Sequence, residues 1–390
     1  MKVSRQASSL LVLFGSASLW NICIGMNHVV IPLYAHFLGF SILKVSSVVS
    51  LPVLATFFVR FVGGALSDRF GERKVLQACY LLNTLSALVL LQAAGFVSLF
   101  VAVAISNVSR SFFWTPAQSM ASQLPGLSSG KSLGRLSACN AAGNFVGVAL
   151  GGALVAISGY AGTFIFLLGA TLTSSVLGFF LPAVEEKPRG RSVWKILVGI
   201  GDHLRRGRTW FTITASFAAG LTPALCQSIY PVYLAELHYG AQWIGATLSV
   251  RGLGPVISGL LLAAWITPSR QLAMYAAGMA GLGIFLIGSG LVENLFLLAL
   301  CIVALGTGSG LMDVWYQVEA TNLSTAHDRS VAMASMGMGW NFSYIVMPLV
   351  AGWIADAQGV QFSLWAMGGF FLVVAAGTRV WHRLLAPATS

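Results

Sequence analysis

Apolar runs long enough to cross a lipid bilayer recur along the whole chain, and they constrain the fold more than any other feature of the sequence. A helix needs about 20 predominantly apolar residues to span the hydrocarbon core. Only 8% of the residues are charged, against roughly 25% in soluble domains, which leaves too little charge to cover soluble domains. The sequence therefore predicts an all-α integral membrane protein.

A hydropathy window of about 20 residues divides the chain into twelve transmembrane helices. They are expected at about 10–35, 43–66, 75–95, 97–121, 134–157, 161–182, 210–236, 242–266, 272–291, 294–319, 331–355 and 360–381. The N-terminal run has small residues at 16–18, as at a signal-peptide cleavage site, but it continues to Tyr34, which favours an uncleaved first span.

One long polar stretch separates the sixth span from the seventh, and it has room for an interfacial helix over 193–204. We therefore expect an N-terminal six-helix bundle over 1–184, a cytoplasmic linker over 185–209 and a C-terminal six-helix bundle over 210–390.

The basic residues predict the orientation of these helices in the membrane. Most of the 22 Lys and Arg residues fall in segments that are cytoplasmic if both termini are cytoplasmic, as the positive-inside rule requires. We therefore expect a multi-pass protein of the cytoplasmic (inner) membrane with both ends inside. The net charge of +11 follows from this bias and requires no nucleic-acid partner.

Three weak internal matches share a separation of about 200 positions. A Pro-x-Tyr ends at Tyr34 and again at Tyr233, and Trp114 in the fourth span aligns with Trp315 in the tenth. The glycine-rich fifth span likewise aligns with the eleventh. The shared separation predicts two pseudo-symmetric halves of six helices each, an architecture that alternating-access transporters use.

The segment "GGALSDRFGERKVL" at residues 63–76 collects charge between the second and third spans. It resembles the loop signature G-x-x-x-D-[RK]-x-G-x-R-[RK] of the major facilitator superfamily, at the place where that family carries it. The matching residues are Gly64, Asp68, Arg69, Gly71, Arg73 and Lys74. The resemblance, together with the span pattern, implies the fold of that superfamily over the whole chain.

Most of this loop has a simple interpretation as a turn that sets topology. Gly64 allows a neighbouring helix to approach, Gly71 permits positive φ, and the bases keep the loop inside. Asp68 has no role in such a turn. The resemblance implies that Asp68 contacts the N-terminal end of the eleventh span near Arg329, and so latches the halves together on the cytoplasmic side. Glu319, at the inner end of the tenth span, is expected to join Arg329 in a charge cluster, with gating as a second interpretation.

The fifth span carries a stripe of small residues, Gly143, Gly147, Gly151 and Gly152, which predicts close helix packing. The stripe also resembles an antiporter signature of the superfamily. Val148 stands where that signature has proline, and this departure weakens the case for antiport.

Four charged residues inside predicted spans require an explanation, because an ionised group at mid-bilayer costs at least about 2.5 kcal/mol: Arg60, Arg110, Arg251 and Asp313. The resemblance implies that the first, fourth, seventh and tenth spans line a central cavity, which places Arg110 and Asp313 there. They form either a static buried pair or a site where substrate or a proton competes for the partner. Arg60 is expected to reach the inner surface, and the role of Arg251 stays open.

Arg110 also resembles the fourth-span arginine that the superfamily associates with proton coupling, and Asp313 is the candidate proton carrier. On the first span, Asn21, Asn27 and His28 are candidate cavity residues, although a lone histidine more often packs. The aromatic side chains of Trp114, Trp315 and Tyr316 either line the cavity or belong to the packed interior.

The sequence gives no support for an enzyme. "GLSSGKS" at residue 126 lacks one residue of a phosphate-binding loop, and the five cysteines lack metal-ligand spacing, so no cofactor or metal is expected. The predicted function is proton-coupled export of a small molecule, as in the drug-exporter branches that the motifs resemble, by a monomer among membrane lipids. The alternatives are an organic-anion carrier and a non-transporting sensor or assembly protein.

Overall fold

The computed structural model describes residues 2–56, 59, 69–123, 128–182, 207–324, 333 and 335–385. Every regular element in these ranges is helical, so the all-α prediction is confirmed. The chain divides into two compact units. Unit 1 contains Met1–Phe40, Leu51–Gly190 and Leu234–Ser249, and unit 2 contains Ser41–Ser50, Arg191–Tyr233 and Val250–Ser390.

This division follows the predicted halves except in two short segments, residues 41–50 and 234–249, each of which groups with the opposite unit. The predicted boundary at 184 falls among residues 183–206, which lie outside the described part of the chain, and the boundary at 210 comes soon after them. The strictly sequential domain division therefore stays a prediction.

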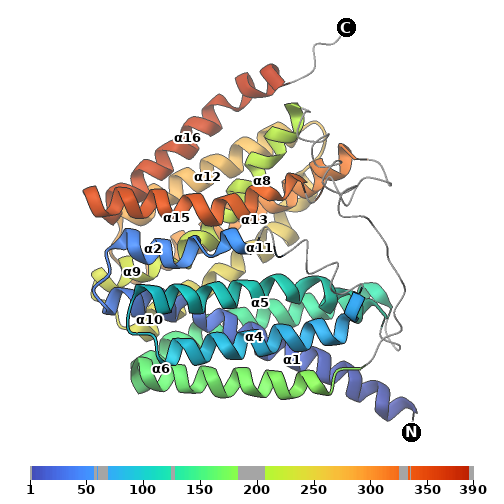
Figure 1. Cartoon of the computed structure of the whole chain (residues 1–390). Helices are drawn as coiled ribbons and strands as arrows, with labels where there is room; N and C mark the ends of the chain where they lie inside the picture. The colour runs from blue at the N-terminus through green and yellow to red at the C-terminus, as the bar shows by residue number, and fades with distance from the viewer. Residues whose placement is uncertain are drawn as a thin grey trace. The chain divides into compact units, whose positions relative to one another are not determined.

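Unit 1 contains five of the described helices, which are labelled in Figure 1. They are α1 (Lys2–Phe37), α4 (Glu72–Leu91), α5 (Phe96–Gln123), α6 (Ser129–Phe179) and α10 (Ala241–Ser249). The most extensive packing is between α1 and α6, and α4 packs on both α5 and α6.

Unit 2 contains α2 (Ile42–Ser50) and the helices of the second half. These are α8 (Gly207–Cys226), α9 (Ile229–Glu236, whose last three residues group with unit 1), α11 (Leu253–Ile257), α12 (Gln271–Leu291), α13 (Leu295–Asn322), α15 (Met338–Gln358) and α16 (Val360–Leu385). Between α10 and α12 three short segments depart from α-helical hydrogen bonding: 3-10 turns at Val250–Gly252 and Ala263–Trp265 and a π-helical turn at Ser258–Leu262. The run Ala241–Trp265 is nevertheless long and apolar enough to cross a membrane as one span, in agreement with the span predicted for 242–266.

The described helices coincide with all twelve predicted spans, although nine helices in the described ranges are long and apolar enough to cross a membrane. The number is lower because α6 joins the fifth and sixth spans, because the seventh is divided into α8 and α9, and because the second is described only over 42–56. Large apolar side chains such as Ile157, Leu260 and Val373 are exposed, as expected where lipid is the solvent.

The two halves repeat the same turns. Gly159 (φ 66°) reverses the chain inside α6, and Gly359 (φ 88°) does so between α15 and α16, about 200 positions later. Glycine adopts positive φ without steric cost, so it is favoured at both turns. The hydroxyls of the two Pro-x-Tyr tyrosines also make equivalent bonds: Tyr34 donates to the Ala93 carbonyl (2.6 Å), and Tyr233 donates to the Ser289 carbonyl (3.3 Å).

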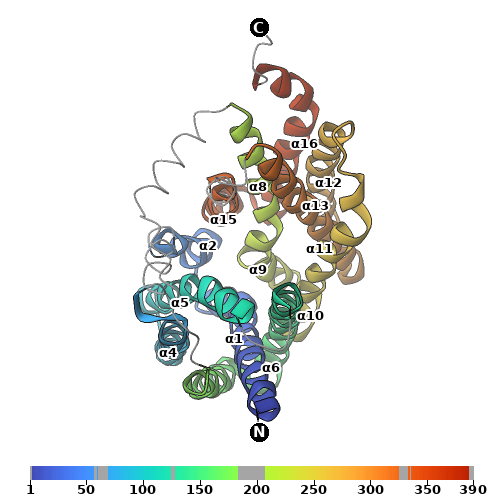
Figure 2. The same ribbon diagram turned by 90° about the vertical axis from the view of Figure 1, so that its right-hand side faces the viewer.

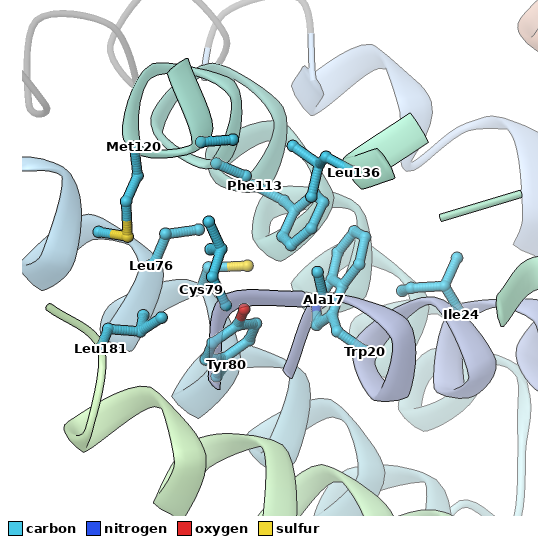
Figure 3. Packing of buried hydrophobic residues seen from close by; sticks show 13 residues of the cluster. Ala17, Trp20, Ile24, Leu76, Cys79, Tyr80, Phe113, Met120, Leu136 and Leu181 are labelled. Atoms are coloured by element: carbon cyan, nitrogen blue, oxygen red, sulfur yellow. The ribbon is translucent and has the colours of Figure 1, made fainter. Parts of the chain in front are cut away.

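The core of unit 1 lies where α1, α4 and α5 meet (Figure 3). Trp20 and Phe113 stack at 3.9 Å between ring centroids, with Tyr80 beside them. The Tyr80 hydroxyl donates to Ser16 Oγ (3.0 Å), and Ser109 Oγ donates to the Cys79 carbonyl (2.8 Å). In lipid, packing and such hydrogen bonds replace hydrophobic driving force between helices.

The corresponding core of unit 2 uses Phe211, Tyr275 and Trp315. Phe211 and Tyr275 stack at 4.2 Å, and Trp315 meets Tyr275 edge-on at 5.1 Å. The Tyr275 hydroxyl is 2.8 Å from Thr214 Oγ1. The tyrosine-to-hydroxyl contact of unit 1 therefore has a counterpart in unit 2.

Candidate transport site and gate

The loop signature is described only from Arg69 onward. Gly64, Asp68 and Arg329 of the predicted gate lie outside the described residues, as does Arg60. Gly71 precedes α4 with φ 84°, the positive value predicted from its place in the signature. Arg69 lies over the ring of Phe70, 5.3 Å from the centroid, and is exposed.

Arg73 has a structural partner that the signature does not reveal. Its Nη2 donates to the Phe179 carbonyl at the end of α6 (2.5 Å), and Gln77 donates to the adjacent Gly178 carbonyl (3.3 Å). The last carbonyls of a helix lack intrahelical partners, and a cation is favourable there. Arg73 thus connects the start of α4 to the end of α6, in addition to any effect on topology. Its neighbour Lys74 is exposed.

Glu72 is a polar junction residue that the sequence did not single out. Its Oε1 accepts from Ser119 Oγ (2.7 Å) and Gln123 Nε2 (3.4 Å), both near the end of α5. In unit 2 the same two helix ends are joined by Gln271 of α12, which donates to Glu319 of α13. The positions repeat about 200 residues apart, with the acid on the opposite helix.

Glu319 is buried, with 6% of its surface exposed. Since Arg329 lies outside the described residues, the predicted charge cluster between these two residues stays a prediction. The Gln271 bond gives Glu319 a structural role at the junction of α12 and α13, a role that the sequence did not predict.

A polar seam runs between α1 and α6 of unit 1. Asn21 Nδ2 donates to Asn140 Oδ1 (2.7 Å), and the His28 ring nitrogen Nδ1 lies 3.4 Å from Asn144 Nδ2. The two pairs lie two turns apart on α1 and one turn apart on α6, so they extend along the same helix contact. We name Asn21, His28, Asn140 and Asn144 the polar seam.

The seam is possible because glycines bring the two backbones together. A Cβ on Gly143 would lie 2.6 Å from the Ser18 carbonyl oxygen, and one on Gly147 would lie 2.2 Å from that of Ile22. The small-residue stripe therefore packs closely, as predicted, with Gly143, Gly147 and Gly151 against α1. Gly152 faces α10 instead, since one residue further along a helix turns the side by about 100°.

Asn140 and Asn144 were not predicted as site residues. Their signal in the sequence is their place beside the stripe: Asn140 lies three residues before Gly143, and Asn144 directly follows it. Asn27 points elsewhere on α1: it is buried (7% exposed), and its Oδ1 has no hydrogen-bond partner among the described residues.

The half-buried Arg110 and Trp114 lie one turn apart on α5. Trp114 meets Phe113 edge-on at 5.6 Å and packs against the core of unit 1. Since Arg110 belongs to unit 1 and Asp313 to unit 2, their pairing stays a prediction.

Asp313 is half-buried on α13, and its Oδ2 accepts a hydrogen bond from Gln317 one turn later (2.9 Å). Tyr316 on the same helix is also half-buried. Trp315 is 1% exposed, and its Nε1 donates to the Gln271 carbonyl (2.8 Å), which favours packing over a cavity role for this residue.

Arg251 lies in the 3-10 turn between α10 and α11 and is half-buried. Its neighbour Gly254 approaches the backbone of Gly306 on α13, where a Cβ would lie 2.2 Å from the Gly306 carbonyl carbon. Irregular backbone inside a span is tolerated where protein or water covers it and often marks functional positions.

The comparisons with known proteins agree with this architecture. The family described as Major Facilitator Superfamily matches residues 11–270 and 225–389. No curated protein matches the chain in sequence.

Three solved structures illustrate the structural similarity. The nucleoside transporter NupG is 13% identical over 96% of this chain and 99% of its own, with a TM-score of 0.82. A bacterial homologue of the human lysosomal transporter Spinster, inward-facing and unoccupied, is 14% identical over 98% and 99%, with a TM-score of 0.75. A POT family transporter in complex with 5-aminolevulinic acid is 13% identical over 97% and 96%, with a TM-score of 0.79.

Proposed function

We propose that this membrane transporter, which belongs to the major facilitator superfamily, exports a small organic solute by alternating access in exchange for protons. The direction is supported by the loop signature and Arg110, which resemble those of exporter branches. We further propose the cytoplasmic membrane as its location, with both termini inside, and a monomer as its working form.

The observation that carries the proton-coupling part of the proposal is the setting of Asp313. Its carboxylate lies within α13, is half-buried, and takes its described hydrogen bond from the neutral Gln317. Intramembrane carboxylates are rare and commonly serve proton relays. A proton on Asp313 removes the charge, so binding and release of the proton can favour different states of the transporter.

The polar seam supports an organic solute that forms hydrogen bonds. Asparagine offers both donors and an acceptor, and histidine changes role with its tautomer, so Asn144 and His28 suit hydroxyl, amide or heterocyclic groups. Two of the similar structures are a nucleoside transporter and a POT family transporter in complex with 5-aminolevulinic acid. Nucleosides and 5-aminolevulinic acid are both small and polar. We propose a solute of this general kind.

The second candidate is an organic-anion carrier. Two arginines, Arg110 and Arg251, lie within described spans, against the single deep acid Asp313. Guanidinium groups bind carboxylate and phosphate through paired hydrogen bonds. A third candidate, a sensor or assembly protein that transports nothing, has less support because these charges are costly to keep within a membrane.

The test is a thermal-shift screen of small solutes with purified protein, followed by flux of the stabilising solute in liposomes with and without a pH gradient. We expect gradient-driven flux that Asp313→Asn uncouples and that the matched variant Glu319→Gln preserves. Gradient-independent flux in the unmodified protein would overturn proton coupling. Absence of flux with every stabilising solute, in folded protein, would favour the sensor.

A further inference from the structure

Asp356, one turn from the C-terminal end of α15, holds the start of α2. Its Oδ1 accepts the Ile42 backbone N–H (2.8 Å), and its Oδ2 accepts that of Leu43 (3.3 Å). One turn earlier on α15, a Cβ on Gly352 would lie 2.7 Å from Ser46 Oγ. Figure 2 shows α2 beside α15.

The two hydrogen bonds satisfy amides that a helix leaves unpaired. The first four N–H groups of a helix have no partner inside it, and together they carry a partial positive charge. The local cap is weak, since Ser41 Oγ accepts the Lys44 N–H at 3.4 Å. Asp356 therefore supplies the stronger cap from another helix, and with a full negative charge.

The contact matters because α2 lies in one of the two short segments, 41–50 and 234–249, that group with the opposite unit. We call these the exchanged segments. Residues 41–50 group with unit 2, and the chain returns to unit 1 through a turn at residues 51–52. The second exchanged segment contains α10, which groups with unit 1, and the chain then re-enters unit 2 at the 3-10 turn Val250–Gly252. Each segment is thus held by one unit and covalently continuous with the other.

The repeat makes the same helix contact twice but places a carboxylate in only one of them. Gly152 of α6 meets α10, where a Cβ would lie 2.8 Å from Gly245 Cα, and Gly352 of α15 meets Ser46 of α2. Gly152 and Gly352 lie about 200 positions apart, and so do Ser46 and Gly245. At the position related to Asp356, α6 has Ala156, which offers no acceptor from its side chain.

We propose that Asp356 is a gate residue of the transport cycle, whose carboxylate holds α2 on α15 in one state and releases it in the other. The proposal rests on alternating access, as proposed above. The charge pattern assigns the beginning of the second span to the outer side of the membrane, so the contact would close the pathway there.

The exposure of Asp356 suits a contact that must open. The side chain is exposed, so water replaces the two amide donors when the contact breaks. A buried ion pair would resist release, because removing its partner leaves a charge without solvation. The two hydrogen bonds to Asp356 therefore favour the closed contact but do not prevent it from opening.

Hydrogen–deuterium exchange of the full-length protein in lipid nanodiscs, without added solute or pH gradient, tests the proposal. Asp356→Ala removes the acceptors, and we expect exchange in 42–50 to rise about fivefold, the usual effect of losing an N-cap. Exchange in 241–249 should rise as well, because the two repeat-related contacts open together. Asp356→Asn keeps one acceptor without the charge and should fall between.

Glu293→Gln is the matched control, since it removes another exposed acid, in the turn between α12 and α13. It should leave both segments unchanged. A rise confined to 42–50 would show that Asp356 only caps α2 and would overturn the gate, as would no change at all. Should Asp356→Ala fail to fold, Asp356→Asn decides by the same criterion. The readout needs no transport, so it stands apart from failure of the flux assay.

Discussion

Replacing Gly147 by alanine tests how the two principal helices of unit 1 are held together. Gly147 lies on the face of α6 that meets α1, in the middle of the small-residue stripe. The new Cβ would lie 2.2 Å from the Ile22 carbonyl oxygen and 2.9 Å from both the Ile22 carbonyl carbon and Cα. All three atoms are backbone, so no rotamer change of Ile22 can relieve the overlap.

The magnitude follows from the displacement required. Ordinary contact begins near 3.4 Å, so α1 and α6 must separate by about 1 Å, in a packed interior where overpacking costs about 1–3 kcal/mol. The separation also stretches the Asn21–Asn140 and His28–Asn144 contacts, and interhelical hydrogen bonds in membranes contribute about 0.6 kcal/mol each. Alanine regains up to about 1 kcal/mol of helix propensity. The net loss is about 1–3 kcal/mol.

Gly169→Ala is the matched control, because a Cβ there would meet no atom within 4 Å and the residue lies on the same helix. It should be neutral or slightly stabilising through helix propensity. In detergent-solubilised protein followed by tryptophan fluorescence, we expect Gly147→Ala to lower the unfolding midpoint by about 2–12 °C, at about 2–4 °C per kcal/mol. Midpoints within 2 °C of each other for the two variants would refute the close contact between α1 and α6.

Two further predictions concern the loop signature. Glu72→Ala should destabilise the protein by about 1–3 kcal/mol in the same thermal assay, because Ser119 and Gln123 lose their acceptor; addition of Ser119→Ala should cause little further loss, and full additivity of the two effects would contradict the bond. Asp68→Asn, predicted from the signature alone, should impair liposome flux while membrane insertion stays normal, and unchanged flux would dispose of the cytoplasmic latch.

The sequence was sufficient for features that depend on short-range pattern. Apolar length predicted where helices lie, and the positive φ of Gly71 followed from its place in the signature. The spacing of Gly143 and Gly147 predicted a close helix contact. Each of these properties is decided within a few turns of chain, so local residue types are enough.

The sequence was insufficient where the partner is distant along the chain. Nothing in residues 41–50 indicates that Asp356, more than 300 positions away, caps them. The bond between Glu319 and Gln271 was missed for the same reason, and the choice between cavity and core for Trp315 depended on the carbonyl that its indole reaches. Helical periodicity identifies which face of a span is covered, but it does not identify the covering helix.

The two halves of the repeat share helix contacts at matching positions but differ in where they place acidic side chains. Ser109 and Ser309, about 200 positions apart, both donate to carbonyls of a neighbouring helix, Cys79 in one unit and Ala218 in the other. The junction acid, by contrast, moves from α4 in the first half to α13 in the second. The duplicated scaffold thus constrains packing at matching positions while its acids differ.

If packing alone set the function, the two halves would be interchangeable at their acidic positions. They are not: Asp313 and Asp356 have Phe113 and Ala156 at the positions 200 residues earlier. Phe113 is part of a stacked core, where a carboxylate would be buried against Trp20. Because a charge of this kind is accommodated at residue 313 and would be buried in a stacked core at residue 113, the proposed proton binding by Asp313 and gate release by Asp356 would leave the shared scaffold undisturbed.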